Sequence, residues 1–278
     1  MSAMPEITTL PRGLVSFSTN GHPDARIFCL PYAGGSASVF AGWQRALPAN
    51  LEVCAIELPG RGSRFSEAAL THMDVVVDEL VRIVGDCPPA PFALFGHSMG
   101  AVVAVELARR LVDQGCRPIA LVASACAAPH LPIRREHVLH LLPRDALIDA
   151  LIRLDGLPAV ARERRDFLDT FMPTIRADLQ CRETWRSTPR DLGIPVHVLT
   201  GANDALVSET DALAWQVFTS VEFSTRRFDG GHFFIHSATQ AVLDHLAAIV
   251  QRSLAPRRDN VVPPGCSMYA TDNDRGTK

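Results

Sequence analysis

Short apolar runs alternate along the chain with longer segments of helical periodicity, and this alternation constrains the fold more than any other feature. Most of the runs lack polar alternation, which is typical of strands covered on both faces. The runs lie at residues 26–31, 51–58, 92–96, 118–124, 194–201 and 221–228. Helical patterns lie at residues 38–47, 73–84, 99–114, 207–218 and 234–253. The alternation predicts an α/β fold, with a mostly parallel sheet and helices on both sides.

One segment, residues 130–190, interrupts the alternation because it offers no strand. Its proline-led periodicity predicts helices at residues 143–154, 158–171 and 173–185. A helical insertion of this length between two strands predicts a lid. We therefore expect one folded domain over residues 1–254, followed by a disordered tail at residues 255–278, which are polar and rich in turn formers.

Composition excludes several kinds of chemistry. The only lysine is Lys278, which excludes a Schiff-base lysine, a pyridoxal phosphate anchor and the lysine of a phosphate-binding loop. The seven cysteines never occur as C-x-x-C, so the sequence predicts free thiols and neither a disulfide framework nor a zinc site. A net charge of −3 argues against nucleic-acid binding. The chain shows neither a signal peptide nor a membrane-spanning apolar run, which favours a soluble, cytoplasmic protein.

The sequence GHSMG at residues 96–100 matches G-x-S-x-G, a sharp turn that presents a nucleophilic serine between a strand and a helix. Its context fits, because the apolar run FALF precedes it and the helical pattern MGAVVAVELARRL follows. Gly96 and Gly100 leave room for a strained backbone at Ser98, and the N-terminus of the following helix favours negative charge. We predict that Ser98 is a nucleophile.

A serine hydroxyl needs a general base, and in sites of this type the order along the chain is serine, acid, histidine. His232 follows the last predicted strand within the sequence DGGHFF, whose glycines permit a close approach. The alternative base is His236, which falls on the following helix. We predict that His232 is the base.

The acid follows by elimination. The sequence SACAAP after the fourth predicted strand holds no carboxylate, whereas Asp204 follows the next strand at the carboxyl edge, where such sheets place their sites. Asp204 would orient the imidazole of His232. The alternative is that Asp204 only caps the helix that starts near Val207.

Acyl transfer also needs two backbone donors for a negatively charged oxygen. Met99, directly after the nucleophile, supplies one N–H. The loop PYAGG after the first predicted strand supplies the other, and Ala33 is the candidate because Gly34 and Gly35 allow the backbone to turn inward.

Together, these segments resemble a known family. The sequences FCLPYAGGSASVFAGW, IELPGRGSR, FGHSMGA, VLTGANDALVS and GGHFF are similar to those of type II thioesterases of non-ribosomal peptide and polyketide synthase systems, within the α/β-hydrolase superfamily. The resemblance spans about residues 26–250 and includes LIRLDGLP and MPTIRADLQCRETW, which resemble the family's lid. Carried over by position, the family's triad falls on Ser98, Asp204 and His232, and its oxyanion donors fall on Ala33 and Met99. The polar tail after residue 254 departs from the family's usual short ending.

The resemblance implies an α/β-hydrolase fold with a helical lid, and a serine-dependent thioester hydrolase that uses no metal or cofactor. The implied substrate is an acyl, aminoacyl or peptidyl group on the phosphopantetheine arm of a carrier protein, and the implied task is to clear mis-primed synthases. Carrier protein domains are the implied partners, with no nucleic acid and no membrane, and we expect a monomer.

Further residues are candidates for partner and substrate contacts. Arginines in or beside the insertion would face an acidic carrier, unless they only form a solvated helix face. They are Arg134, Arg135, Arg162, Arg164 and Arg165. Arg61 and Arg64 are interpreted as ion pairs that hold a loop near the site. Candidates for lid residues that limit the length of the acyl group are Leu139, Leu142, Leu151, Phe171 and Met172.

Three other functions remain open from the sequence. They are a free-standing enzyme that releases a finished product by hydrolysis or cyclisation, a generic carboxylesterase, and a non-catalytic binding protein on a hydrolase scaffold. The presence of all three triad positions argues against the last of these.

Overall fold

The computed structural model describes residues 10–18, 22–133, 138–157, 160, 163 and 165–255. Within them, a seven-stranded sheet has the order β1-β3-β2-β4-β5-β6-β7. Neighbouring strands pair in parallel except at one edge, where β1 runs antiparallel to β3. The strands are β1 (Leu14–Ser16), β2 (Ala25–Leu30), β3 (Leu51–Ile56), β4 (Phe92–His97), β5 (Ala120–Ser124), β6 (Val196–Gly201) and β7 (Phe223–Phe228).

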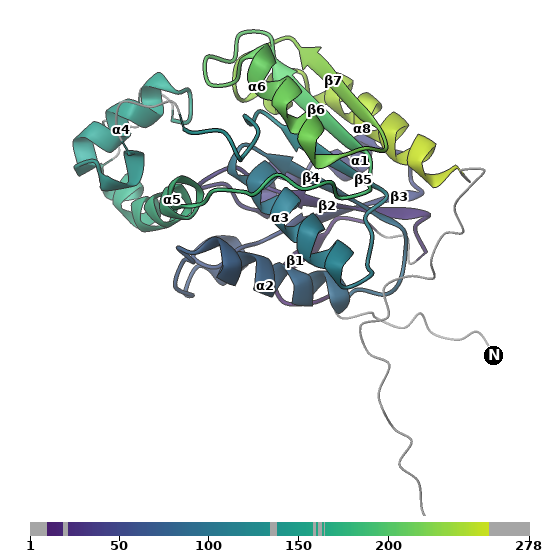
Figure 1. Ribbon diagram of the computed structural model, residues 1–278. Helices are drawn as coiled ribbons and strands as arrows, with labels where there is room; N and C mark the ends of the chain where they lie inside the picture. Colours follow the sequence, from purple (N-terminus) through teal and green to yellow (C-terminus); the bar gives the residue numbers. More distant parts are fainter. Residues whose placement is uncertain are drawn as a thin grey trace, which may run out of the picture.

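Helices cover both faces of this sheet (Figure 1). One face packs against α2, α3 and η5, and the other packs against α1, α7 and α8. The α-helices are α1 (Trp43–Ala46), α2 (Met73–Gly85), α3 (Met99–Asp113), α4 (Arg144–Arg153), α5 (Arg165–Thr184), α6 (Glu209–Leu213), α7 (Phe234–Ser237) and α8 (Thr239–Leu254). The 3-10 helices are η1 (Ala37–Phe40), η2 (Gly62–Arg64), η3 (Leu139–Leu141) and η5 (Ala214–Phe218).

The predicted α/β fold is confirmed, since every predicted strand is present. The strands β2, β3, β4 and β5 are buried along their whole length, which explains why their sequences show no polar alternation. The sequence missed β1, because this edge strand has three residues and only Leu14 among them is buried. The helix expected at residues 207–218 is divided into α6 and η5.

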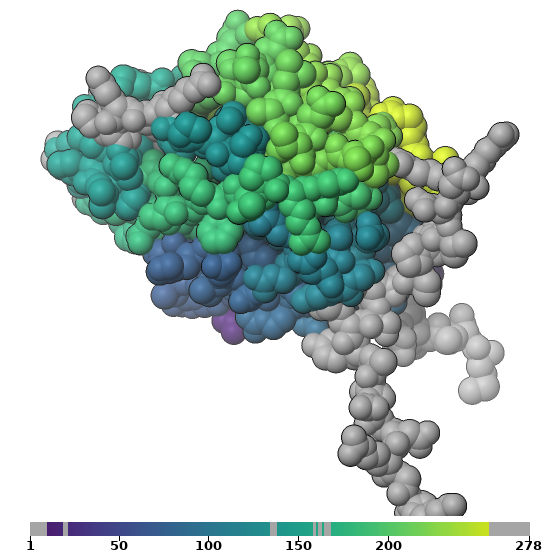
Figure 2. Space-filling model, viewed as in Figure 1, coloured from purple at the N-terminus to yellow at the C-terminus, as the bar shows by residue number. Residues whose placement is uncertain are grey.

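Between β5 and β6 the described residues form η3, α4 and α5 and no strand; we call these three elements the helical segment. The segment lies at one end of the sheet (Figure 1) and packs against the rest of the molecule in the space-filling view (Figure 2). It has its own apolar cluster, separate from the two clusters of the sheet. The helix predicted at residues 143–154 corresponds to α4.

The predicted helix boundary at Pro173 is wrong, because α5 continues through this proline as one helix. A proline inside a helix leaves the carbonyl four residues earlier without its donor. Here both Pro173 and Asp169 are exposed, so solvent can reach that carbonyl. The buried side chains on the opposite side continue at helical spacing across the proline, and they hold the two halves in line. They are Leu168, Met172, Ile175 and Leu179.

The cysteines differ in part from the prediction. Cys29, Cys54, Cys87 and Cys181 are free thiols, but Cys116 is disulfide-bonded, which corrects the expectation for that residue. Spacing along the sequence cannot reveal a pairing between distant cysteines. The tail predicted to be disordered lies outside the described residues from residue 256 onward. None of the helices that the structure describes is long and apolar enough to cross a membrane.

Candidate active site

The turn between β4 and α3 holds Ser98 in an unusual conformation. Its φ of 54° lies in a region that residues with a side chain rarely adopt, and its N–H donates to the carbonyl of Ser124 on the neighbouring strand at 2.8 Å. A Cβ atom at Gly96 would lie 2.1 Å from the carbonyl oxygen of Gly100, and one at Gly100 would lie 2.2 Å from that of Leu30. Both positions therefore require glycine, and the tight packing holds the strained serine in place.

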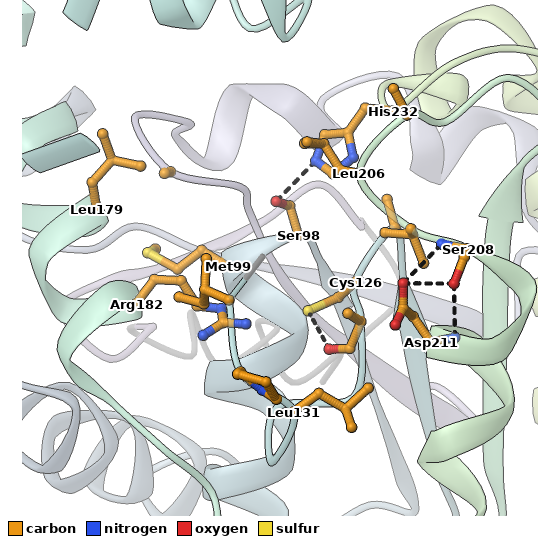
Figure 3. A pocket seen from close by; sticks show the side chains of 17 residues that line it. Ser98, Met99, Cys126, Leu131, Leu179, Arg182, Leu206, Ser208, Asp211 and His232 are labelled. Carbon is orange, nitrogen blue, oxygen red and sulfur yellow. Dashed lines mark hydrogen bonds between the residues drawn. The ribbon is translucent and has the colours of Figure 1, made fainter. Parts of the chain in front are cut away.

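Three predicted residues from distant parts of the chain meet at this turn. His232 Nε2 lies 3.0 Å from Ser98 Oγ, and His232 Nδ1 lies 2.9 Å from Asp204 Oδ2. The side chain of Asp204 is fully buried and that of His232 is 9% exposed. Figure 3 shows the hydroxyl of Ser98 directed at the imidazole. Such a chain of hydroxyl, imidazole and carboxylate can move a proton away from the serine.

The sequence left two alternatives open, Asp204 as a helix cap and His236 as the base, and the geometry supports neither. The N-cap of α6 is Ser208, which forms a capping box with Asp211, so the helix does not depend on Asp204 for its cap. Asp204 instead uses its second oxygen to accept the N–H of Leu206 at 2.8 Å, which fixes the carboxylate. His236 Nε2 lies 3.2 Å from the Tyr32 hydroxyl, and it is His232 that contacts Ser98.

The two predicted backbone donors lie beside the serine. Ala33 and Met99 line one cavity together with Ser98 and His232. Their N–H groups donate no hydrogen bond to any other residue that the structure describes, and Met99 is the first residue of α3. These N–H groups and the positive end of the helix dipole are therefore available to a negatively charged oxygen near Ser98.

His97, the residue before Ser98, has a neutral imidazole beside His232. Its imidazole is fully buried, and Nδ1 lies 2.9 Å from the Ser124 hydroxyl. Burial holds the pKa of His97 well below its ordinary value, and the neighbouring His232 and His236 lower it further. Because His97 stays neutral, it places no second positive charge beside His232 when His232 takes up a proton.

Two cavities meet at Ser98. The larger has a volume of about 270 Å³ and combines polar groups with apolar ones, including Arg182 from α5 and Ser208 (Figure 3). The smaller has about 80 Å³ and is mostly apolar. Residues common to both are Ala33, Ser98, Leu179, Leu206 and His232. A ligand that reaches Ser98 therefore meets two spaces with different linings.

The predicted lining residues divide between these spaces and the interior of the helical segment. Leu139 and Leu151 line the smaller cavity. Leu142, Phe171 and Met172 line neither cavity and lie in the apolar cluster of the helical segment, to which Leu139 and Leu151 also belong. The sequence analysis missed several other lining residues, because no local pattern shows which side of a helix or loop faces the serine. They are Leu154, Leu157, Ile175 and Leu206.

Arginines were predicted in two roles, as ion pairs near the site and as contacts to a carrier, and the structure tests only the first. The predicted ion pairs are confirmed: Arg61 pairs with Asp178, and Arg64 pairs with Glu67 and Glu79. The arginines proposed to face a carrier, Arg134, Arg135, Arg162 and Arg164, lie outside the described residues, as does the side chain of Arg165. Among the residues that are described, no group of three or more His, Cys, Asp or Glu side chains could hold a metal ion.

The sheet order, with a serine on the strand–helix turn after β4 and the histidine and carboxylate on loops at the carboxyl edge, defines an α/β hydrolase. Structural neighbours of this fold are thioesterases. Residues 25–250 match the thioesterase domain family, and the chain belongs to this family.

Its relatives come from biosynthetic pathways. The gramicidin S biosynthesis protein GrsT of Aneurinibacillus migulanus is 32% identical over 253 residues, which cover 90% of this chain and 98% of that protein. The RedJ thioesterase from the prodiginine pathway of Streptomyces coelicolor is 33% identical with a TM-score of 0.74, covering 82% of this chain and 86% of RedJ. The type II thioesterase BorB from the borrelidin biosynthetic cluster is 32% identical with a TM-score of 0.76, and the match covers 88% of this chain and 98% of BorB.

Proposed function

We propose that this protein is a type II thioesterase, which hydrolyses acyl, aminoacyl or peptidyl thioesters on the phosphopantetheine arms of carrier proteins and so regenerates mis-primed synthases. The observation that carries the proposal is the contact of His232 with both Ser98 and Asp204 beside two cavities. The names of the relatives support the choice of substrate, because they place those proteins in peptide and polyketide biosynthesis.

The reaction runs through an acyl-enzyme. Ser98 Oγ attacks the thioester carbonyl while His232 Nε2 takes the hydroxyl proton, and Asp204 stabilises the imidazolium. His232 then returns this proton to the departing pantetheine sulfur, which leaves an acyl ester on Ser98. In the second half, His232 takes a proton from water, the hydroxide attacks the ester, and the proton returns to Ser98 Oγ as the free acid leaves.

The N–H groups of Ala33 and Met99 would bind the oxygen that becomes negative in both halves. A thiol is a good leaving group, so a positioned serine and these two donors should provide most of the acceleration. Loss of one such donor costs about 10²–10³ in turnover in comparable sites.

The two cavities suggest how the substrate divides at Ser98. The smaller, apolar cavity suits an acyl chain, and the larger, more polar cavity suits the amides of the pantetheine arm. We further propose that the helical segment acts as a lid over both, since Leu179 on α5 lines each of them. A monomeric enzyme that acts in the cytoplasm on carrier protein domains, without metal or cofactor, completes the proposal.

The test is mass spectrometry of acyl-loaded carrier protein with and without enzyme. The wild type should remove the acyl mass and leave the free thiol, and Ser98→Ala should lose hydrolysis yet still bind the acyl carrier. Full activity of Ser98→Ala would overturn the scheme. Two comparisons address the other functions: faster turnover of a full-length chain than of acetyl would indicate product release, and equal efficiency on oxygen esters would indicate a carboxylesterase.

A further inference from the structure

A buried ion pair connects α5 to the loop that carries Ala33. Arg61, after β3, forms a two-pronged pair with Asp178 on α5: Nη1 lies 2.7 Å from Oδ2 and Nη2 lies 2.8 Å from Oδ1. Asp178 is 2% exposed and Arg61 is 3% exposed. Neither residue lines the cavities at Ser98. Removal of two charges from water is costly, so a pair this deep needs further partners.

Those partners are backbone groups of the turn at residues 32–35. Asp178 Oδ2 accepts the N–H of Gly34 at 2.7 Å, and Arg61 Nη1 donates to the carbonyl of Gly35 at 3.0 Å. The two charged groups therefore hold the two residues that directly follow Ala33. The contact with α5 is close, because a Cβ atom at Gly34 would lie 2.7 Å from Ile175 Cγ1.

The geometry of the turn links these two hydrogen bonds to the direction of the N–H of Ala33. The carbonyl of Tyr32 accepts the N–H of Gly35 at 2.9 Å, and Gly34 has a φ of 77°, as the third residue of a type II turn does. The carbonyl of Tyr32 and the N–H of Ala33 belong to one trans peptide unit, so they point in opposite directions. As long as the turn is closed, the N–H of Ala33 points outward from it.

We infer that Asp178, held by Arg61, is a positioning residue for the oxyanion hole. It contacts no substrate; it fixes the turn that presents the N–H of Ala33, and it makes that presentation depend on the docking of α5. The inference rests on the proposed function, since it assigns Ala33 to the stabilisation of the reaction's negative oxygen. The helical segment thereby contributes to the chemical step as well as to the walls of the cavities.

The test uses Asp178→Asn, the double variant Arg61→Met/Asp178→Leu, and Thr174→Val as a matched control. Thr174 also lies on α5, is buried, and anchors the helix through a 2.7 Å hydrogen bond to the carbonyl of Gly60, but its side chain forms no hydrogen bond to the turn among the described residues. The double variant replaces the pair by apolar groups, which avoids leaving one buried charge alone. Melting temperatures of all variants report the structural cost separately.

Two measurements are informative: kcat and KM for an acyl thioester, and the inhibition constant of an alkylboronic acid, which bonds to a serine hydroxyl as a tetrahedral anion. For the Asp178 variants we expect kcat to fall about 10- to 100-fold, part of the cost of a lost donor. The inhibition constant should rise by a similar factor, while KM changes by less than about 3-fold. Thr174→Val should leave both near the wild-type values.

The outcomes are distinguishable. If kcat and boronate inhibition of Asp178→Asn match those of Thr174→Val, or if only KM changes, the inference is wrong. If the double variant does not fold, Asp178→Asn decides the question alone, because the substitution keeps the shape of the side chain. A wild type that neither hydrolyses thioesters nor binds the boronate would instead refute the proposed function.

Discussion

The close approach of α3 to the end of β2 gives the sharpest prediction, which concerns Gly100→Ala. Gly100 is the second residue of α3, and a Cβ atom there would lie 2.2 Å from the carbonyl oxygen of Leu30 and 2.7 Å from that of Pro31. Contacts below 3.0 Å essentially do not occur for real Cβ atoms, so the helix and the end of β2 must separate by about 0.8 Å.

This displacement would occur between the two halves of the proposed site. Ser98 is the N-cap of α3 and Met99 is its first residue, whereas Leu30 and Pro31 lead directly into the turn that presents Ala33. A misplacement of about 1 Å costs about 10² in rate in preorganised sites, so we expect kcat/KM of Gly100→Ala to fall about 100-fold. Overpacking against backbone should also lower the free energy of unfolding by about 1–3 kcal/mol.

The assay compares Gly100→Ala with Gly42→Ala, which makes the same chemical change in open space. No atom lies within 4 Å of a Cβ built at Gly42, and its φ is −84°. Thiol release from an acyl thioester gives kcat/KM, and urea denaturation followed by circular dichroism gives stability. Gly42→Ala should retain wild-type kcat/KM and stay within about 0.5 kcal/mol of wild type in unfolding free energy. Equal activities of the two variants would refute the argument from close packing.

Three further predictions concern the neighbouring groups. Asp204→Asn should fold but lose about 10⁴ in kcat, because an amide does not stabilise the imidazolium of His232; a loss below 10-fold in a steady-state assay would contradict the proposed role of Asp204. The pKa of buried His97 is lowered, so below about pH 6.5 its imidazole takes up a proton only in the unfolded chain. The free energy of unfolding should therefore decrease as the pH is lowered, by up to about 1.4 kcal/mol per pH unit. Urea titrations at about pH 7 and pH 5 should show a smaller loss for His97→Asn than for wild type, and equal losses would exclude His97 as the source. Leu151→Phe should reduce the apolar cavity, so kcat/KM for octanoyl thioester should fall about 10-fold relative to acetyl, and an unchanged ratio would place the acyl chain elsewhere.

The sequence predicted those parts of the fold and site that depend on local pattern. Apolar runs buried on both faces marked the parallel strands, and the glycines at positions 96 and 100 marked a turn where backbones nearly touch. Sheet topology then brings the carboxyl ends of β4, β6 and β7 to one edge, so Asp204 and His232 could be chosen by their place after a strand.

What the sequence could not predict depends on contacts between distant residues. Pro173 is tolerated within α5 because the carbonyl that it leaves without a donor is on the exposed side and because side chains on the buried side pack with α4 and η3. The bond from Gly34 to Asp178 joins residues 144 positions apart, and neither residue lies in a pattern that indicates the other. The antiparallel edge strand β1 is likewise too short to carry a periodicity of its own.

The separate apolar cluster of the helical segment has a consequence for its dynamics. Because α4 packs mainly within that cluster, it can loosen without exposing the interior of the sheet, whereas α5 is also bonded to the turn at residues 32–35 through Asp178. Amide protons of α4 should therefore exchange with heavy water well before those in the second half of α5. The helical segment would then open on the side of α4 only, while α5 stays in place.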